Sequence, residues 1–213
     1  MRLAPKVSRG SGMEVALYTV AGFVLGAVPF SLLVGKWLLH ADVRDYGDGN
    51  PGAINAGKAG GWPVGLLAGA LDYLKGALPV ALAHYLSGVE GWNLVPVAIA
   101  PIAGHAFSPF LRFRGGKAIA ATFGVWTGLT LYRGPVVLGL SLALFALLLD
   151  EDAWSAVLGM TGLLAYLLVA GYDGQFLAVW SGNMLIVLYK HQAELARGVR
   201  LKPWVLKALR RSA

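Results

Sequence analysis

The chain of 213 residues is 57% hydrophobic and only 14% charged, and its mean hydropathy is +0.63. This composition excludes a disordered chain, a nucleic-acid-binding tail and a disulfide-rich secreted protein, and it predicts an all-α integral membrane protein of one domain. The sequence contains no cysteine, so it offers no disulfide, no thiolate nucleophile and no cysteine-based metal site. The net charge of +7 is informative only through the positions of the charges.

Charge-free stretches predict seven membrane-spanning helices. A helix needs about 20 apolar residues to cross the hydrocarbon core, and three charge-free runs have 20 or 21 residues. Three further runs of 15 or 16 residues are flanked by Lys117, Arg133 and Lys190, whose long side chains can reach the membrane surface. A seventh span contains two charges. Within a single domain, 1–213, the predicted helices are 14–39, 61–87, 91–111, 118–132, 134–150, 153–172 and 174–190.

The basic residues orient these helices. With seven spans, 13 of the 18 Lys and Arg residues lie in the loops 41–60 and 112–117, in the tail 191–213 or at the adjoining helix ends. The positive-inside rule makes this face cytoplasmic, which places the N-terminus outside and the C-terminus inside. The basic tail, with Trp204 and Leu209, predicts an anchor to anionic lipid headgroups.

Two features leave this topology open. The stretch 118–149 fits either two spans or one re-entrant unit, although the Arg-Gly-Pro sequence in its middle is a turn signal that favours two spans. The N-terminal tail carries Arg2, Lys6 and Arg9 on the outer side, against the positive-inside rule. A natural start at Met13 would remove these three charges.

The second predicted helix, 61–87, contains the charged residues Asp72 and Lys75. Residues three apart lie on one helical face, so these side chains can form an ion pair. Charges within a membrane are costly unless they are satisfied, so this face is expected to point into the bundle or into a water-filled cavity. The sequence leaves open whether the pair is structural or functional.

The first polar loop, 41–60, is rich in glycine and asparagine. Glycines permit positive φ, so successive backbone N–H groups can converge on an anion. Beside a helix end, such a loop predicts a phosphate cradle. The alternative is an ordinary glycine-rich turn between two membrane helices.

Two further polar segments are predicted on the same face. In the segment 104–122, two arginines and Lys117 surround a Gly-Gly pair, which suits a dianionic ligand but also fits positive-inside anchoring. Anchoring does not explain His105, which lies about two turns inside an apolar run. At the end of the last helix, His191 is either an interfacial side chain or a third part of the same site.

Together these segments resemble the bacterial acyl-phosphate:glycerol-3-phosphate acyltransferase family of the PlsY type, over residues 20–195. The family pattern D-x-R-x-x-G-S-G-N-x-G-A-T-N is matched at Asp42, Arg44, Gly47, Gly49, Asn50, Gly52, Ala53 and Asn55. Its helix pattern D-x-x-K-G is matched at Asp72, Lys75 and Gly76. Its second loop pattern is matched at Gly104, His105, Phe110, Phe113, Gly115, Gly116, Lys117, Ala121 and Thr122.

The resemblance implies an enzyme of phospholipid biosynthesis. It would transfer a fatty acyl group from acyl phosphate to glycerol-3-phosphate, giving lysophosphatidic acid, without a metal or another cofactor. Its partners would be these two substrates and membrane lipids. We expect a multi-pass monomer in the bacterial plasma (inner) membrane, with the active site facing the cytoplasm and no contact with nucleic acid.

The resemblance also implies roles for individual residues. The glycine loop would hold the phosphate of the acyl donor, and the basic residues would bind glycerol phosphate, while the leaving phosphate itself can accept the hydroxyl proton. The implied catalytic residues are Lys117, His191 and Asn50. The implied substrate-binding residues are Arg44, Gly47, Asp48, Gly49, Gly52, Ala53, Asn55, Lys58, His105, Gly115, Gly116 and Glu194.

The chain departs from the family pattern at four positions. Asp48 replaces a serine, Ile54 a threonine, Lys58 an arginine and Glu194 an asparagine. Two of these changes put carboxylates near a phosphate site, where like charges repel. Three explanations are open. The carboxylates can turn away and pair with Arg44 or Lys190. Otherwise the acceptor is a different phosphorylated compound, or the chain is an inactive paralogue.

Two other functions fit the sequence. The chain can be a non-catalytic binder of an anionic lipid or metabolite. It can also be a small transporter with re-entrant glycine loops, although the placement of all the polar segments on one face argues against alternating access.

Overall fold

The computed structural model describes residues 10–212. Within this part the regular structure is helical, with an isolated antiparallel bridge between Leu149 and Leu201 and no strand. The N-terminal tail with Arg2, Lys6 and Arg9 lies outside the described residues. Four segments are long and apolar enough to cross a membrane, namely Gly12–Leu39, Trp62–Leu86, Gly91–Leu111 and Asp152–Val169.

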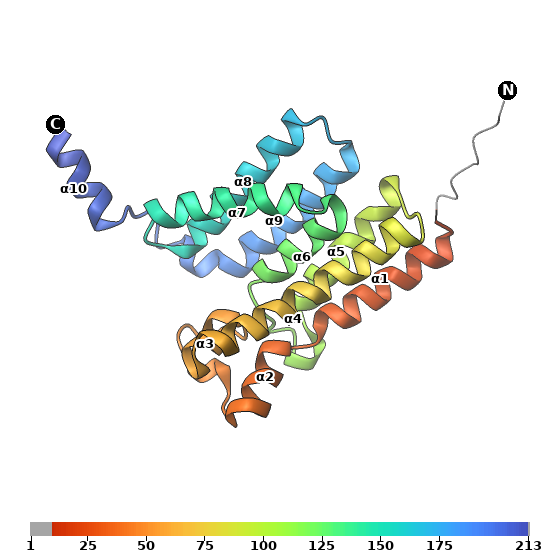
Figure 1. Ribbon diagram of the computed structural model, residues 1–213, viewed down its shortest axis with the longest axis horizontal. Coiled ribbons are helices and arrows are strands. Elements are labelled where there is room, and N and C mark those ends of the chain that lie inside the picture. The colour runs from red at the N-terminus through yellow and green to blue at the C-terminus, as the bar shows by residue number, and fades with distance from the viewer. Residues whose placement is uncertain (1–9, 213) are drawn as a thin grey trace. The chain divides into compact units, whose positions relative to one another are not determined.

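The chain forms two compact units, Met1–Leu129 and Thr130–Ala213. The first unit contains α1 to α5 and nearly all of α6, and the second contains α7 to α10 (Figure 1).

The first predicted helix, 14–39, is broken into α1 (Gly12–Ala27) and α2 (Phe30–Leu39). The break lies at Pro29, which has no N–H to donate and disfavours a helical residue before it. Val28 is accordingly extended, with φ −60° and ψ 122°. The predicted span 14–39 agrees with the apolar segment Gly12–Leu39, but the break inside it was not predicted, because a count of charge-free residues does not register a proline.

Small residues allow α1 to pack closely along α5 (Leu94–Ala106). A Cβ atom on Gly26 would come within 2.6 Å of Pro101 Cα, and one on Gly104 would lie 2.9 Å from Ala27 N. Such backbone-to-backbone approach at glycines is typical of helices in membranes.

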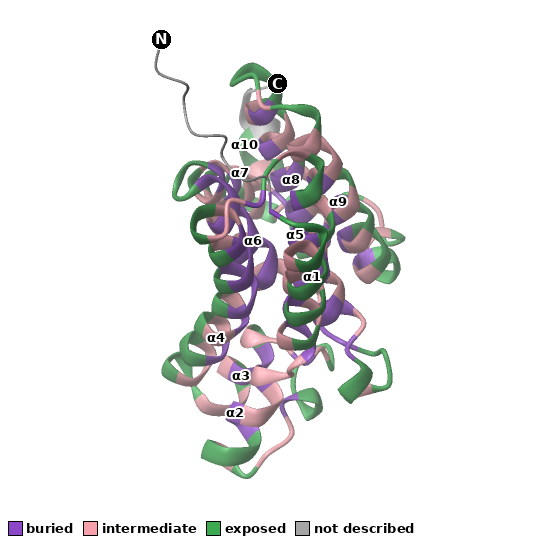
Figure 2. Cartoon of the chain, turned by 90° about the vertical axis from the view of Figure 1, so that its right-hand side faces the viewer, coloured by how far each residue is buried: buried purple, intermediate pink, exposed green. Residues whose placement is uncertain are grey.

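Glycines also bring α4 (Trp62–Ala81), which continues as a π-helical turn over Leu82–Leu86, against α6 (Ile119–Thr130). A Cβ atom on Gly124 would lie 2.8 Å from Ala77 N, and Tyr73 donates a hydrogen bond to Thr127 at 2.9 Å. No residue of α6 is exposed, as Figure 2 shows by its colour. A helix that is apolar all round is expected to be buried in this way.

The second unit consists of α7 (Arg133–Leu148), α8 (Asp152–Val169), α9 (Gly174–Leu195) and α10 (Pro203–Ser212). α8 packs on α7, where Gly159 and Gly162 lie against Leu142 and Ser141. α9 continues for five residues beyond the predicted end at 190, because polar residues can extend a helix out of the apolar region.

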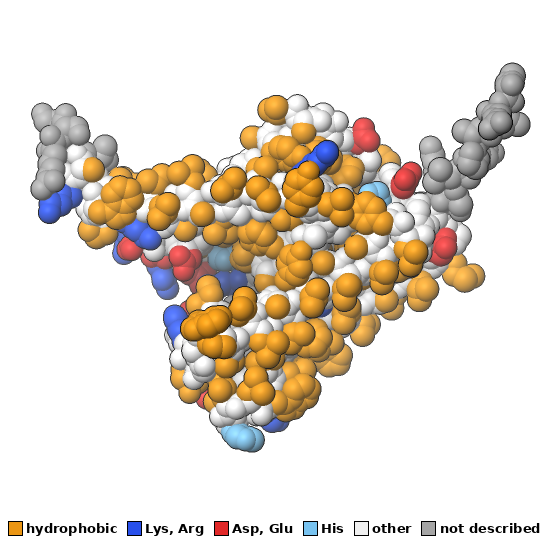
Figure 3. Space-filling model, in the orientation of Figure 1, with side chains coloured by type: hydrophobic (Ala, Val, Ile, Leu, Met, Phe, Trp, Pro, Cys, Tyr) orange, Lys and Arg blue, Asp and Glu red, His pale blue; other side chains and the backbone are white. Residues whose placement is uncertain are grey.

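The outer surface of α1 is apolar. Met13, Leu17, Val20 and Val24 recur at helical spacing and are 51% to 82% exposed. Hydrophobic side chains cover the visible face of α1 and α4 in Figure 3. A continuous apolar stripe of this kind is what lipid contact requires.

Candidate active site

The glycine loop between α2 and α3 has a backbone that only glycine adopts easily. Gly47 and Gly49 have φ values of +62° and +74°. Space also requires glycine at position 47, because a Cβ atom there would overlap the side-chain oxygen of Asn55 and lie 2.8 Å from Lys58 Nζ. The loop is therefore shaped to bring an amide and an ammonium group close to its backbone.

The loop runs into α3 (Ala53–Gly60), a short helix in the region that the sequence predicted as a loop. Ala56 N donates to Gly52 O at 3.0 Å, so the N–H groups of residues 53–55 precede the first bond within the helix. Such a helix start attracts anions. The buried Asn55 turns its side chain back and donates to Asn50 O at 2.9 Å, which fixes the loop to the helix.

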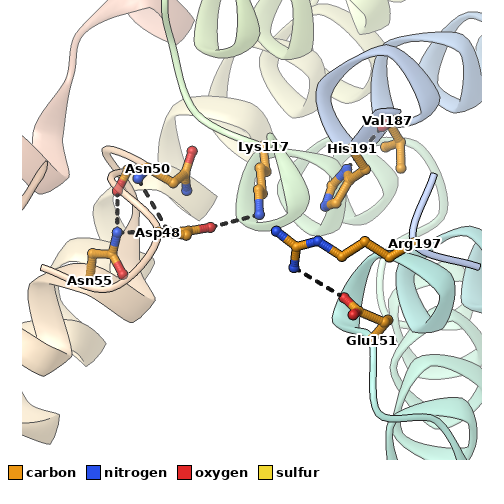
Figure 4. A network of polar contacts seen from close by, with 8 residues as sticks. All are labelled: Asp48, Asn50, Asn55, Lys117, Glu151, Val187, His191 and Arg197. Carbon is orange, nitrogen blue, oxygen red and sulfur yellow. Dashed lines mark hydrogen bonds and ion pairs between the residues drawn. The ribbon is translucent and has the colours of Figure 1, made fainter. Parts of the chain in front are cut away.

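The carboxylate of Asp48 lies at the centre of this loop (Figure 4). It accepts hydrogen bonds from Lys117 Nζ at 2.7 Å, from Asn55 Nδ2 at 2.8 Å and from the backbone N–H of Asn50 at 3.2 Å. The sequence had left Asp48 free to turn away and pair with Arg44 or Lys190. The structure instead pairs it with Lys117, a residue to which the family resemblance assigns catalysis.

These contacts change the acidity of Asp48. Partial burial raises the pKa of its carboxyl group, but the hydrogen bonds from Lys117, Asn55 and Asn50 outweigh this effect and lower the pKa to about 2. The group is therefore an anion at every physiological pH, and its negative charge faces the Lys117 ammonium.

A second ion pair lies inside the first unit. Lys75 Nζ is 2.7 Å from Asp72 Oδ1, and both side chains are only 2% exposed. Ser31 donates to the other oxygen of Asp72 at 2.7 Å, and Lys75 donates to Val28 O at 2.8 Å. That carbonyl is available because the helix is broken at Pro29. His105 Nδ1 lies 3.7 Å from Asp72 Oδ1.

His105 connects this buried pair to the loop that carries Lys117. Gly116 N donates to His105 O at 3.1 Å. A Cβ atom on Gly116 would overlap His105 Nε2, and one on Gly115 would lie 2.9 Å from the carbonyl carbon of Ala106. The two glycines thus let the loop lie directly on the His105 ring, immediately before Lys117.

Arg44 pairs with a different carboxylate and not with Asp48. It forms an ion pair with Asp42, and this contact raises the pKa of Arg44 and lowers that of Asp42. Arg44 also lines an open pocket of about 530 Å³ whose other lining residues are Leu32, Phe110, Leu111, Arg112 and Arg114. Three guanidinium groups around one pocket make it strongly basic.

The remaining predicted site residues belong to the second unit. His191 and Glu194 lie three residues apart on α9, and His191 is buried, with Nδ1 2.9 Å from Val187 O. In the same unit, Arg197 forms an ion pair with Glu151 at 3.6 Å, also drawn in Figure 4.

The first unit brings together most of the residues that the sequence singled out, including Gly47, Asp48, Asn50, Asn55, Lys58 and Lys117. Ser31 was missed, although it holds the buried pair. A hydroxyl group two residues after a proline in an apolar span was the available signal.

The chain matches the family model described as Glycerol-3-phosphate acyltransferase over residues 16–200. It is 40% identical over 189 residues to Glycerol-3-phosphate acyltransferase 1 of Thermotoga maritima, covering 82% of this chain and 93% of that protein. It is 33% identical over 185 residues to Glycerol-3-phosphate acyltransferase of Parasynechococcus marenigrum, covering 87% of this chain and 86% of that protein.

Two solved structures are also similar. Both are crystal structures of PlsY (YgiH), described as an integral membrane glycerol 3-phosphate acyltransferase. The glycerol 3-phosphate form gives a TM-score of 0.78 at 27% identity, and the lysophosphatidic acid form gives 0.77 at 26%. Each comparison covers 86% of this chain and 90% of the other.

Proposed function

This chain belongs to the glycerol-3-phosphate acyltransferase family and is a multi-pass membrane enzyme that makes lysophosphatidic acid, and we propose that its acyl donor is an acyl phosphate and that the site around Asp48 and Lys117 binds the phosphate groups. The family match favours this enzyme over the lipid binder and the transporter that the sequence had left open.

The proposed reaction needs little chemistry from the protein. An acyl phosphate is a mixed anhydride and is already activated. The glycerol hydroxyl oxygen forms a bond to the acyl carbon, the bond from that carbon to the phosphate oxygen breaks, and the hydroxyl proton passes to the released phosphate. The protein has to place two anionic substrates together and stabilise the charge that develops.

One observation carries the assignment of the site. Three donors of different kinds converge on a single carboxylate, namely the Lys117 ammonium, the Asn55 amide and the Asn50 backbone N–H. Ionised oxygens form their strongest hydrogen bonds with such donors. The same donors suit a phosphate oxygen, and Lys58 beside Gly47 adds a second positive charge.

Several expectations from the sequence stay proposals for this chain. They are seven spans, an outer N-terminus, a site facing the cytoplasm of a bacterial cell, a monomeric state, and binding of substrate by His191 and Glu194. The crystal structures of PlsY hold glycerol 3-phosphate and lysophosphatidic acid in that protein, which supports the same acceptor here.

The purified protein is expected to form lysophosphatidic acid from acyl phosphate and glycerol-3-phosphate. The variant Lys117→Ala removes the charged donor, and kcat is expected to fall by about 10²- to 10³-fold. Lys36→Ala is the matched control, since Lys36 is an exposed lysine of the same unit without an assigned role. Absence of product with folded protein across several acyl chain lengths would contradict the proposed donor.

A further inference from the structure

Asp48 stands at a position where the family pattern that the sequence resembles has a serine. A serine hydroxyl is neutral, whereas the pKa of about 2 keeps Asp48 fully ionised. A fixed negative charge in a phosphate site either leaves the site when a phosphate binds or takes part in the function of the site.

The surroundings of Asp48 resemble those of a bound anion. Its oxygens accept from an ammonium, an amide and a backbone N–H, with distances of 2.7 to 3.2 Å. A phosphate oxygen needs the same kinds of donor at the same lengths. The carboxylate therefore occupies the place that a substrate phosphate would take beside Lys117.

The carboxylate is also free to leave. Its side chain is 47% exposed, and that of Lys117 is 24% exposed. A change of the Asp48 side-chain rotamer would carry the carboxylate into water without opening a cavity. Water then solvates the released charge, so the displacement has a low cost.

We propose that Asp48 is an internal anion that holds Lys117 in the free enzyme and competes with the substrate phosphate for it. This proposal rests on the proposed function, because it places Asp48 in the phosphate site of that reaction. Asp48 thereby acts as a specificity-determining residue and raises the concentration of phosphate ester needed to occupy the site.

The competition favours dianions over monoanions. A monoanion that replaces the carboxylate leaves the charge beside Lys117 unchanged, whereas a phosphate dianion adds one further negative charge near two lysines. A phosphate ester is mostly dianionic above pH about 6. The site is thus expected to bind phosphate or sulfate and to discriminate against nitrate.

Binding of inorganic phosphate to the whole purified protein tests this directly. The variants Asp48→Ser and Asp48→Asn are expected to lower the Kd for phosphate by about tenfold, which corresponds to about 1.4 kcal/mol. They are also expected to admit nitrate. Asp45→Asn, which removes an exposed acid three residues away, is the matched control and is expected to leave both affinities unchanged.

Thermal unfolding without phosphate identifies any variant that fails to fold, and the second variant then decides. Unchanged phosphate affinity in a folded Asp48 variant would overturn the proposal. Loss of kcat without a change in the KM for glycerol-3-phosphate would also overturn it, because the carboxylate would then take part in the chemistry.

The phosphate measurement needs no turnover, so the two proposals fail separately. A parent protein that forms no lysophosphatidic acid but binds phosphate, and binds it more tightly as Asp48→Ser, would contradict the proposed donor and support the internal anion. A parent protein that forms lysophosphatidic acid, with the same phosphate affinity as the Asp48 variants, would support the proposed donor and contradict the internal anion.

Discussion

The first unit contains two lysine–carboxylate pairs that have the same length and opposite surroundings. Lys75 and Asp72 are 2.7 Å apart and 2% exposed, and Lys117 and Asp48 are also 2.7 Å apart but 24% and 47% exposed. The buried pair joins two residues of one helix, whereas the exposed pair joins two loops 69 residues apart.

The difference shows that distance alone does not define the role of an ion pair. Charges taken out of water lose more hydration energy than one contact restores, so a buried pair needs further partners. Ser31 and the carbonyl of Val28 supply them for Asp72 and Lys75. The exposed pair stays in contact with water and is weak, so another anion can replace its carboxylate. The buried pair therefore connects α4 to Ser31 of α2 and to the carbonyl of Val28, whereas an anion can open the exposed pair.

The largest expected effect is on the buried pair. Lys75→Met leaves the Asp72 charge buried without its ammonium partner and is expected to cost about 3–5 kcal/mol of stability. Thermal or denaturant unfolding in detergent measures this cost. The double variant Asp72→Asn, Lys75→Met removes both charges and should recover much of the loss. Equal losses in the single and double variants would show that burial of an unpaired charge is not the cause.

The next effect tests whether the two regions are connected through His105. A Cβ atom at Gly116 would overlap His105 Nε2, so Gly116→Ala must displace either the His105 ring or the loop that carries Lys117. A displacement of about 1 Å can reduce kcat/KM by about 10²-fold. Gly12→Ala is the control, because a Cβ atom there meets nothing within 4 Å. Normal activity of a folded Gly116→Ala variant would show that the two regions are not connected through His105.

Ser31 gives a smaller effect that should remain in the buried region. Ser31→Ala leaves one oxygen of Asp72 without its hydroxyl donor, and loss of a hydrogen bond to a buried charge is expected to cost about 2 kcal/mol. The unfolding midpoint should fall while phosphate affinity stays unchanged. Ser181→Ala, at an exposed serine whose hydroxyl donates to Leu177 O within α9, is expected to be nearly neutral. A change in phosphate affinity would mean that the buried pair controls the exposed one.

The sequence predicted the buried pair because its geometry is local. Two charges three residues apart on one helix must lie on one face, whatever the rest of the fold does. Helices were similarly predicted from charge-free runs, although the break at Pro29 and the short helix Ala53–Gly60 were missed. Both depend on backbone preferences that a count of charges does not include.

The exposed pair could not be predicted in the same way. The sequence placed Asp48 and Lys117 in loops on one face, but no spacing rule connects residues 69 positions apart. The choice of Lys117 over Arg44 depends on where the glycine loop turns and on how Gly115 and Gly116 lie against α5. These are tertiary contacts, so only a structure could supply them.

The smallest expected effect is the pH dependence of the exposed pair. The pKa of Asp48 is lowered from 3.8 to about 2, so the pair's stabilisation is complete above pH 4 and is lost as the pH falls towards 2. Because both side chains are partly exposed, the contribution is expected to be below about 1 kcal/mol. The midpoint difference between the parent and Asp48→Asn, measured from pH 5 to pH 2, isolates it, since every other carboxylate titrates in both proteins. The difference should be constant above pH 4 and shrink below it. A difference that is undiminished between pH 4 and pH 2 would mean that the carboxylate stabilises the loop without its charge. The pair could then not serve as the exchangeable anion site that distinguishes it from Asp72 and Lys75.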